Sequence, residues 1–289
     1  MRTLCRPILA AVIMPAVLVP MGCGRGDGTK LTLRYHPPAG ATYRYTLEQQ
    51  NNMKFEGGPM AKVPDQQISL HMHYTQTVTG PTEGGVAVAV RFDSTAMELP
   101  LMAPNAYGPA LERMRGLTSN VVYDDRMNVI KAEFTNAGDL SPITEQLGKN
   151  LKAMTFPLPQ DPVGVGDSWT SEMELPINQM GSGGPPTTAK TKLTVKEIHA
   201  GGSDTTVVVA LETTFPTDPI KVTQQGQMIT LNLSGTMTGE QEFSVTRGAV
   251  LRSLMGGTMK IKMTGGMLGP DGTNMTMKQS TSVWIVKAK

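Results

Sequence analysis

The chain alternates apolar and polar residues with a period of two over unusually long runs. Between Tyr43 and Phe55 the odd positions carry most of the apolar side chains, and the even positions are polar throughout. Such alternation predicts antiparallel strands with one face buried and one face solvated. Several runs last about 11 to 15 residues, about twice the length of an ordinary strand. Further alternating runs, some of them shorter, occupy residues 68–78, 86–92, 189–196, 207–215, 229–233, 251–263 and 273–287.

One segment has the spacing of a helix instead. Ser141 and Pro142 supply an N-cap followed by proline at the first helical position, and Phe156-Pro157 marks the end. Apolar residues recur between them at spacings of three and four, which predicts an amphipathic helix over residues 142–154. A shorter helix is predicted from Pro109 to Arg115, stopped by Gly116.

These patterns predict a mainly β protein of the α+β class. We expect long antiparallel strands in a strongly curved sheet, with the amphipathic helix packed on its apolar face. A turn glycine followed by a strand that opens on an aromatic occurs at residues 40–43 and again at 166–169. The chain therefore looks duplicated, with a first β-rich half at 31–160 and a second at 161–289. A two-sheet sandwich is the alternative architecture.

The first 22 residues have the features of an export signal. Arg2 and Arg6 precede an apolar stretch, Ile8 to Val19, that is too short to span a bilayer. The stretch ends in Gly22-Cys23, which resembles a bacterial lipoprotein box, although Pro20 departs from the usual leucine. That resemblance implies cleavage before Cys23 and lipidation of its thiol, with residues 23–30 as a short tether. Gly24 is not the aspartate associated with inner-membrane retention, so the outer membrane is the expected location in a diderm host.

Charge and cysteine content exclude several classes of function. The sequence has 26 basic and 24 acidic residues, and loss of Arg2 and Arg6 with the signal leaves 24 of each. A balanced mature chain gives no electrostatic reason to expect nucleic-acid binding. Cys5 would leave with the signal and Cys23 would be acylated, so the body would hold no thiol. Disulfides, cysteine-ligated metals and cysteine nucleophiles are therefore not expected.

Two short motifs could carry chemistry but fit ordinary structure better. Gly166-Asp167-Ser168 is similar to the Gly-Asp-Ser esterase box, yet it opens a strand in mid-chain, and the last histidine is His199. We interpret it as a turn in which Asp167 accepts backbone N–H groups. His71 and His73 could form a copper or zinc pair, but they lie on the polar side of their strand. Asp124 to Asn128 is interpreted as a hairpin turn.

Methionine is the compositional oddity, with 21 residues against 14 for phenylalanine, tyrosine and tryptophan together. In an exported protein this raises the hypothesis of copper handling. Most of these methionines fall on the apolar stripes, where they serve as core filler or line a cavity for flexible apolar ligands.

Three segments resemble a family of uncharacterised bacterial lipoproteins that contain a domain of unknown function. They are the stretch from Leu31 to Tyr45, the Phe-Pro-Leu-Pro-x-x-Pro-Val-x-Val-Gly-Asp-Ser-Trp stretch from Phe156 to Trp169, and Gly248 to Ser253. The overall pattern is also similar to the half-barrel of bacterial lipoprotein carriers. These resemblances imply architecture and localisation, and they imply no catalytic residues.

The sequence thus predicts a non-enzymatic envelope lipoprotein, anchored through Cys23 and without cofactor, metal site or catalytic residues. Its expected partners are the membrane and a hydrophobic ligand or lipid held in the curved sheet. A scaffold for another envelope protein is the alternative, and copper handling or hydrolysis are remote alternatives.

Overall fold

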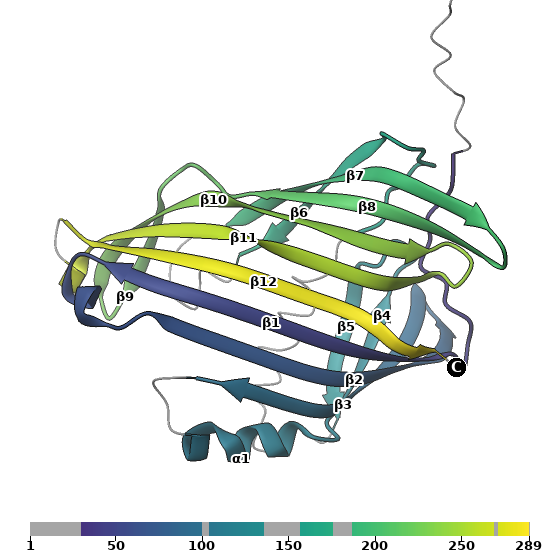
Figure 1. Ribbon diagram of the computed structural model, residues 1–289, viewed down its shortest axis with the longest axis horizontal. Coiled ribbons are helices and arrows are strands. Elements are labelled where there is room, and N and C mark those ends of the chain that lie inside the picture. Colours follow the sequence, from purple (N-terminus) through teal and green to yellow (C-terminus); the bar gives the residue numbers. More distant parts are fainter. Residues whose placement is uncertain (1–29, 100–103, 136–156, 176–186, 269–270, 289) are drawn as a thin grey trace, which may run out of the picture.

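The computed structural model describes residues 30–99, 104–135, 157–175, 187–268 and 271–288 (Figure 1). Strands dominate, and the predicted mainly β architecture is confirmed. The elements, in chain order, are β1 (Thr42–Glu56), η1 (Pro59–Lys62), β2 (Gln66–Thr82), β3 (Gly85–Glu98), α1 (Pro104–Met114), β4 (Thr118–Tyr123), β5 (Val129–Thr135), β6 (Ser168–Glu174), β7 (Thr188–Gly201), β8 (Asp204–Thr214), β9 (Ile220–Gln224), β10 (Gln227–Ser244), β11 (Ala249–Gly265), η4 (Gly266–Leu268) and β12 (Thr273–Ala288).

The twelve strands of the described residues all belong to one antiparallel sheet. Its order is β5-β4-β3-β2-β1-β12-β11-β10-β8-β7-β6. The short strand β9 pairs with the N-terminal part of β10, which does not pair with β8. Most neighbours in the sheet are also consecutive in the chain. The exceptions are the seam, where β1 pairs with β12, and the pair of β10 with β8, between which β9 lies in the sequence. Within the part of the chain that the structure describes, the sheet does not close, because β5 and β6 lie at its two edges. A single sheet of this kind excludes the two-sheet sandwich.

The strands alternate as the sequence predicts. In β7 the side chains of Thr191, Leu193 and Val195 are buried, whereas Lys190 and Lys192 are exposed. The long runs at 68–78 and 251–263 are confirmed, since β2 and β11 contain 17 residues each. The short run at 229–233 is part of β10, which contains 18 residues.

The apolar face of the sheet is the concave one. Val88 and Val121 from one side of the seam share a buried cluster with Leu193 and Val207 from the other side. These strands are far apart in the sheet order, so the sheet must curve strongly to bring their apolar faces together. Figure 1 shows this curvature.

A strap formed by residues 30–36 crosses one end of the curled sheet. Leu31 exchanges backbone hydrogen bonds with Val163, and Tyr35 N–H donates to Asp125 O in the β4–β5 turn. Arg34 donates to the carbonyls of Pro159 (2.9 Å) and Gln160 (2.7 Å). We call the end of the sheet that residues 30–36 cross the strap end. The strap connects the two edges of the sheet there.

The described parts of the three segments that resemble the lipoprotein family meet at the strap end. The strap belongs to the first segment, and its partners Pro159, Gln160 and Val163 belong to the second. In the third segment, Val250 O accepts a hydrogen bond from the hydroxyl of Tyr45 at 3.1 Å. The contacts of all three segments therefore hold the fold together at the strap end.

The first helix differs from its predicted bounds. The prediction of 109–115 is wrong at the N-terminus, because α1 begins at Pro104 and holds Pro109 in its interior. A proline at the first helical position costs no backbone hydrogen bond. The sequence pattern assigned this position to Pro109, whereas Pro104 occupies it in the structure. The predicted stop is correct: Gly116 has φ +80°, and its N–H donates to Phe92 O. The predicted helix at 142–154 lies outside the described residues.

The two predicted halves lie on opposite sides of the β1–β12 seam. Strands β1 to β5 come from residues 31–160, and β6 to β12 come from residues 161–289. An internal duplication stays a prediction.

Candidate functional site

The concave face of the described strands carries no charged side chain. Tyr45 and Leu47 lie on the concave face, and the strand registers identify the residues of the other strands that share this face. Those residues are apolar or carry hydroxyl or amide groups. The lysines, arginines, aspartates, glutamates and histidines of these strands fall on the opposite rows. Burial of an unpaired charge is costly, whereas apolar side chains gain from leaving water. The concave face is therefore suited to apolar contact.

Away from the strap end, a group of half-buried methionines covers this face. Met53, Met277 and Met259 are direct cross-strand neighbours on β1, β12 and β11. Met259, Met263 and Met275 pack against a buried cluster that includes Leu231 and Ile261. We call the set the methionine stripe: Met53, Met259, Met263, Met275 and Met277.

The methionine stripe differs from the core at the strap end in its exposure. Val88, Val121 and Val207 at that end are 1% exposed or less, whereas each residue of the stripe remains partly accessible. Unbranched thioether side chains adapt to irregular apolar shapes. The stripe is thus an accessible, deformable apolar surface inside the curve of the sheet.

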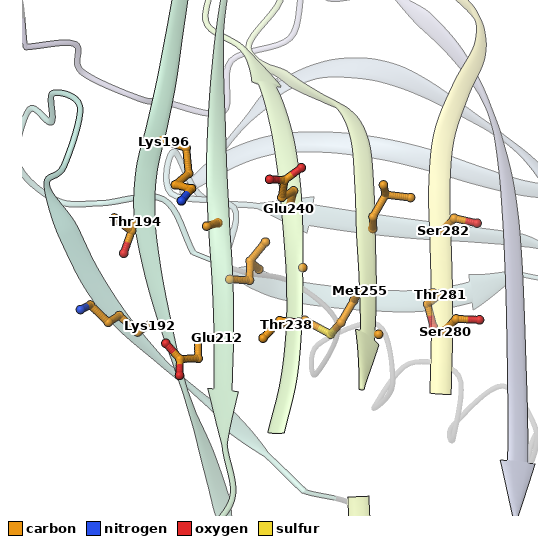
Figure 2. A pocket seen from close by; sticks show the side chains of 15 residues that line it. Lys192, Thr194, Lys196, Glu212, Thr238, Glu240, Met255, Ser280, Thr281 and Ser282 are labelled. Carbon is orange, nitrogen blue, oxygen red and sulfur yellow. The ribbon is translucent and has the colours of Figure 1, made fainter. Parts of the chain in front are cut away.

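The convex face carries a hollow of a different kind (Figure 2). A groove of about 700 Å³ crosses β7, β8, β10, β11 and β12. Its lining includes the small or apolar residues Ala210, Leu254 and Gly256 among longer polar ones. Lys192, Lys196, Glu212 and Glu240 rise around them, and none of the four forms an ion pair with another described residue.

Sequence reasoning missed this groove. It depends on register, since Lys192 lies opposite Glu212, and Thr238 lies between Glu212 and Gly256. The alternating pattern identifies the polar face of each strand but not which strands are neighbours. The small residues Ala210 and Gly256 on the polar face were the signal in the sequence that could have indicated the groove.

The histidine pair does not join the methionines. Thr46 Oγ1 lies 2.9 Å from His73 Nδ1, and His71 Nδ1 lies 3.7 Å from Glu48 Oε1. Both histidines are on the convex face, opposite Met72, so the two residue types do not form one site. Among the residues that the structure describes, no group of three or more histidine, cysteine, aspartate or glutamate side chains could hold a metal.

The Gly-Asp-Ser segment is a turn, as predicted. Asp167 Oδ2 accepts the backbone N–H of Gly164 at 2.9 Å and pairs with Lys30 Nζ at 3.1 Å. The Gly164 N–H, together with the Lys30 ammonium, lowers the pKa of the Asp167 carboxyl. Ser168 is the first residue of β6. The predicted turn at Asp124 is confirmed too, since Asp124 Oδ1 accepts the N–H groups of Arg126 and Asn128.

The tyrosines at the strap end are buried phenols. The rings of Tyr45 and Tyr74 stack with centroids 5.1 Å apart. Burial raises the pKa of Tyr123 to about 12 and raises that of Tyr74 further. These groups stay neutral at physiological pH and belong to the core.

The predicted lipidation residue, Cys23, lies outside the described residues. Lys30, where the described chain begins, lies at the strap end beside Asp167. Within the described residues, no helix has the length and hydropathy needed to cross a membrane.

Comparison with known proteins gives a partial match to a family model and a solved structure of similar fold. The model of a family of unknown function (DUF6263) matches residues 141–250, somewhat more than a third of the chain, including the predicted Phe156–Trp169 segment. Among solved structures, lipovitellin, reported for its lipid–protein interactions, is similar with a TM-score of 0.50 and 10% identity. The match covers 88% of this chain and 26% of the lipovitellin chain, so this chain spans about a quarter of that protein. No curated protein matches.

Proposed function

We propose that this protein is a lipid-anchored, non-enzymatic protein of the bacterial cell envelope that holds a hydrophobic ligand on the concave face of its sheet. The observation that carries the proposal is the methionine stripe, an accessible apolar surface on a face without charged side chains. An acyl chain laid on this surface would lose contact with water and gain contact with polarisable sulfur.

The fold supports the same function. Lipovitellin, whose structure was reported for its lipid–protein interactions, shares the fold over most of this chain. A curled open sheet provides a long apolar trough without the need for a closed cavity. At about 0.8 kcal/mol for each methylene removed from water, a chain of moderate length is enough for stable binding.

The anchor is proposed from Cys23. A tether of about seven residues reaches at most about 25 Å, so the strap end, where Lys30 lies, would face the membrane. Two or more acyl chains on the cysteine would give stable anchoring. The outer membrane is the proposed location in a diderm host.

Native mass spectrometry of the gently extracted full-length protein tests ligand binding. We expect a co-purifying lipid in the wild type and its loss in Met259→Gln/Met277→Gln, since glutamine is close to methionine in size but polar. The matched control, Thr258→Gln/Thr276→Gln, changes the adjacent residues on the opposite face and should keep the lipid. A wild-type protein that purifies without lipid, or a lipid retained equally by both variants, would contradict the proposal.

The convex groove favours a second candidate function, contact with another envelope protein. Its two lysines and two glutamates have no ionic partner among the described residues, so they could pair with a complementary surface. Crosslinking in cells should then yield one dominant partner that is lost in Lys192→Glu/Lys196→Glu while the lipid content is unchanged. A crosslinking pattern identical in the wild type and this variant would exclude the groove as the contact.

A further inference from the structure

Four uncharged polar residues interrupt the apolar concave face near its centre. Gln49 and Asn51 of β1 lie directly opposite Thr281 and Gln279 of β12. All four are half-buried. We call them the polar quartet: Gln49, Asn51, Gln279 and Thr281.

The quartet is enclosed by apolar residues along both strands. On β1 it is flanked by Leu47 and Met53, and on β12 by Val283 and Met277. Across the strands, Leu70 lies beside Gln49 and Met255 beside Thr281. A polar patch inside an apolar surface costs free energy unless something uses its hydrogen-bonding groups.

The hydrogen bonds within the quartet leave most of that capacity unused. Gln49 Nε2 donates to Asn51 Oδ1 at a long 3.5 Å, and Gln279 Nε2 donates to Thr281 Oγ1 at 3.2 Å. Each amide has two N–H donors and a carbonyl oxygen with two lone pairs. The quartet can therefore offer both donors and acceptors to a bound molecule.

The chemistry of the face limits what that molecule carries. No cationic side chain of the described strands shares the concave face, so a carboxylate or phosphate placed there would have no counter-charge. Hydroxyl groups and ester carbonyls, in contrast, match amides and a hydroxyl without any charge.

We propose that the ligand is a neutral amphiphile, such as a diacylglycerol, whose hydroxyl and ester groups bind the polar quartet while its acyl chains lie on the methionine stripe. The inference rests on the proposed function and adds selection against anionic lipids. Met53 and Met277 adjoin the quartet directly, so a head group there places the chains on the stripe.

Competition between two lipids with the same acyl chains tests the selection. The full-length protein is incubated with mixed vesicles that contain equal amounts of diacylglycerol and phosphatidylglycerol, and the bound lipid is identified by mass spectrometry after re-isolation. We expect at least about a tenfold preference for diacylglycerol, equivalent to about 1.4 kcal/mol. Equal retention of the two lipids, or a preference for phosphatidylglycerol, would overturn this inference while leaving the proposed function intact. Retention of neither lipid would overturn both.

Charge introduced at the quartet gives the matched test. Gln49→Lys should shift the preference toward phosphatidylglycerol, because it supplies the missing counter-charge. Gln50→Lys adds the same charge to the exposed convex side of the same strand and should keep the wild-type preference. Thermal unfolding establishes that both variants are folded; if Gln49→Lys is not, Gln279→Lys replaces it. An unchanged preference in a folded quartet variant would contradict the role of the quartet.

Discussion

At the scale of single residues, polar side chains hold together the segments that meet at the strap end. Arg34 donates to Pro159 O and Gln160 O and pairs with Asp125 Oδ2 at 3.0 Å. Trp169 Nε1 donates to Pro157 O at 2.8 Å. The family-like segments were recognisable in the sequence, but their mutual contact was not, because about 125 residues separate the partners.

The turn at Asp167 gives a pH-dependent prediction. The pKa of Asp167 is lowered in the folded protein, first by the Gly164 N–H and then by Lys30. Its stabilising effect is therefore fully present above the ordinary value of 3.8 and is lost as pH falls through the lower folded pKa. Asp167→Asn should unfold at a lower urea concentration than the wild type at pH 7. The difference between the two urea midpoints should shrink below pH 3.8. A gap that persists unchanged in acid would contradict this account; Asp161→Asn, at an exposed residue nearby, is the control.

At the scale of elements, glycines permit close packing of the central strands. A Cβ on Gly239 of β10 would collide with Leu254 O of β11, whereas one on Gly201 would meet nothing. Gly239→Ala should therefore lower the free energy of unfolding by about 1–3 kcal/mol. Gly201→Ala should change it by less than about 0.5 kcal/mol. Chemical denaturation of both variants measures the difference, and equal effects would show that the close approach does not constrain β10.

The sequence was sufficient for the existence and facing of the long strands but not for every length, since the run predicted at 229–233 is part of β10, which contains 18 residues. In β7 and β11 the lysines predicted on the outer face are exposed, and the apolar residues opposite them are buried or half-buried. Strand neighbours could not be predicted, because a period of two does not encode pairing. For that reason the β1–β12 seam, the row from Met53 to Met259 and the polar quartet appear only in the structure.

At the scale of the whole molecule, the curl of one open sheet separates two surfaces. The concave surface collects apolar and uncharged residues, and the convex surface carries the charges and the groove. This separation accounts for part of the methionine excess, because the methionine stripe lies on the concave side. The proposed ligand, anchor and orientation all depend on this separation.

Photo-crosslinking of lipid by methionine analogues tests the central claim most directly. Full-length protein in which photo-methionine replaces methionine is irradiated in cells, and lipid adducts are localised by tandem mass spectrometry. We predict adducts at Met53, Met259 and Met277 on the concave face and few at Met228, which is 61% exposed on the convex side of β10. Adducts at Met228 as frequent as those on the stripe, or irradiated protein without lipid adducts, would contradict ligand binding in the curved sheet.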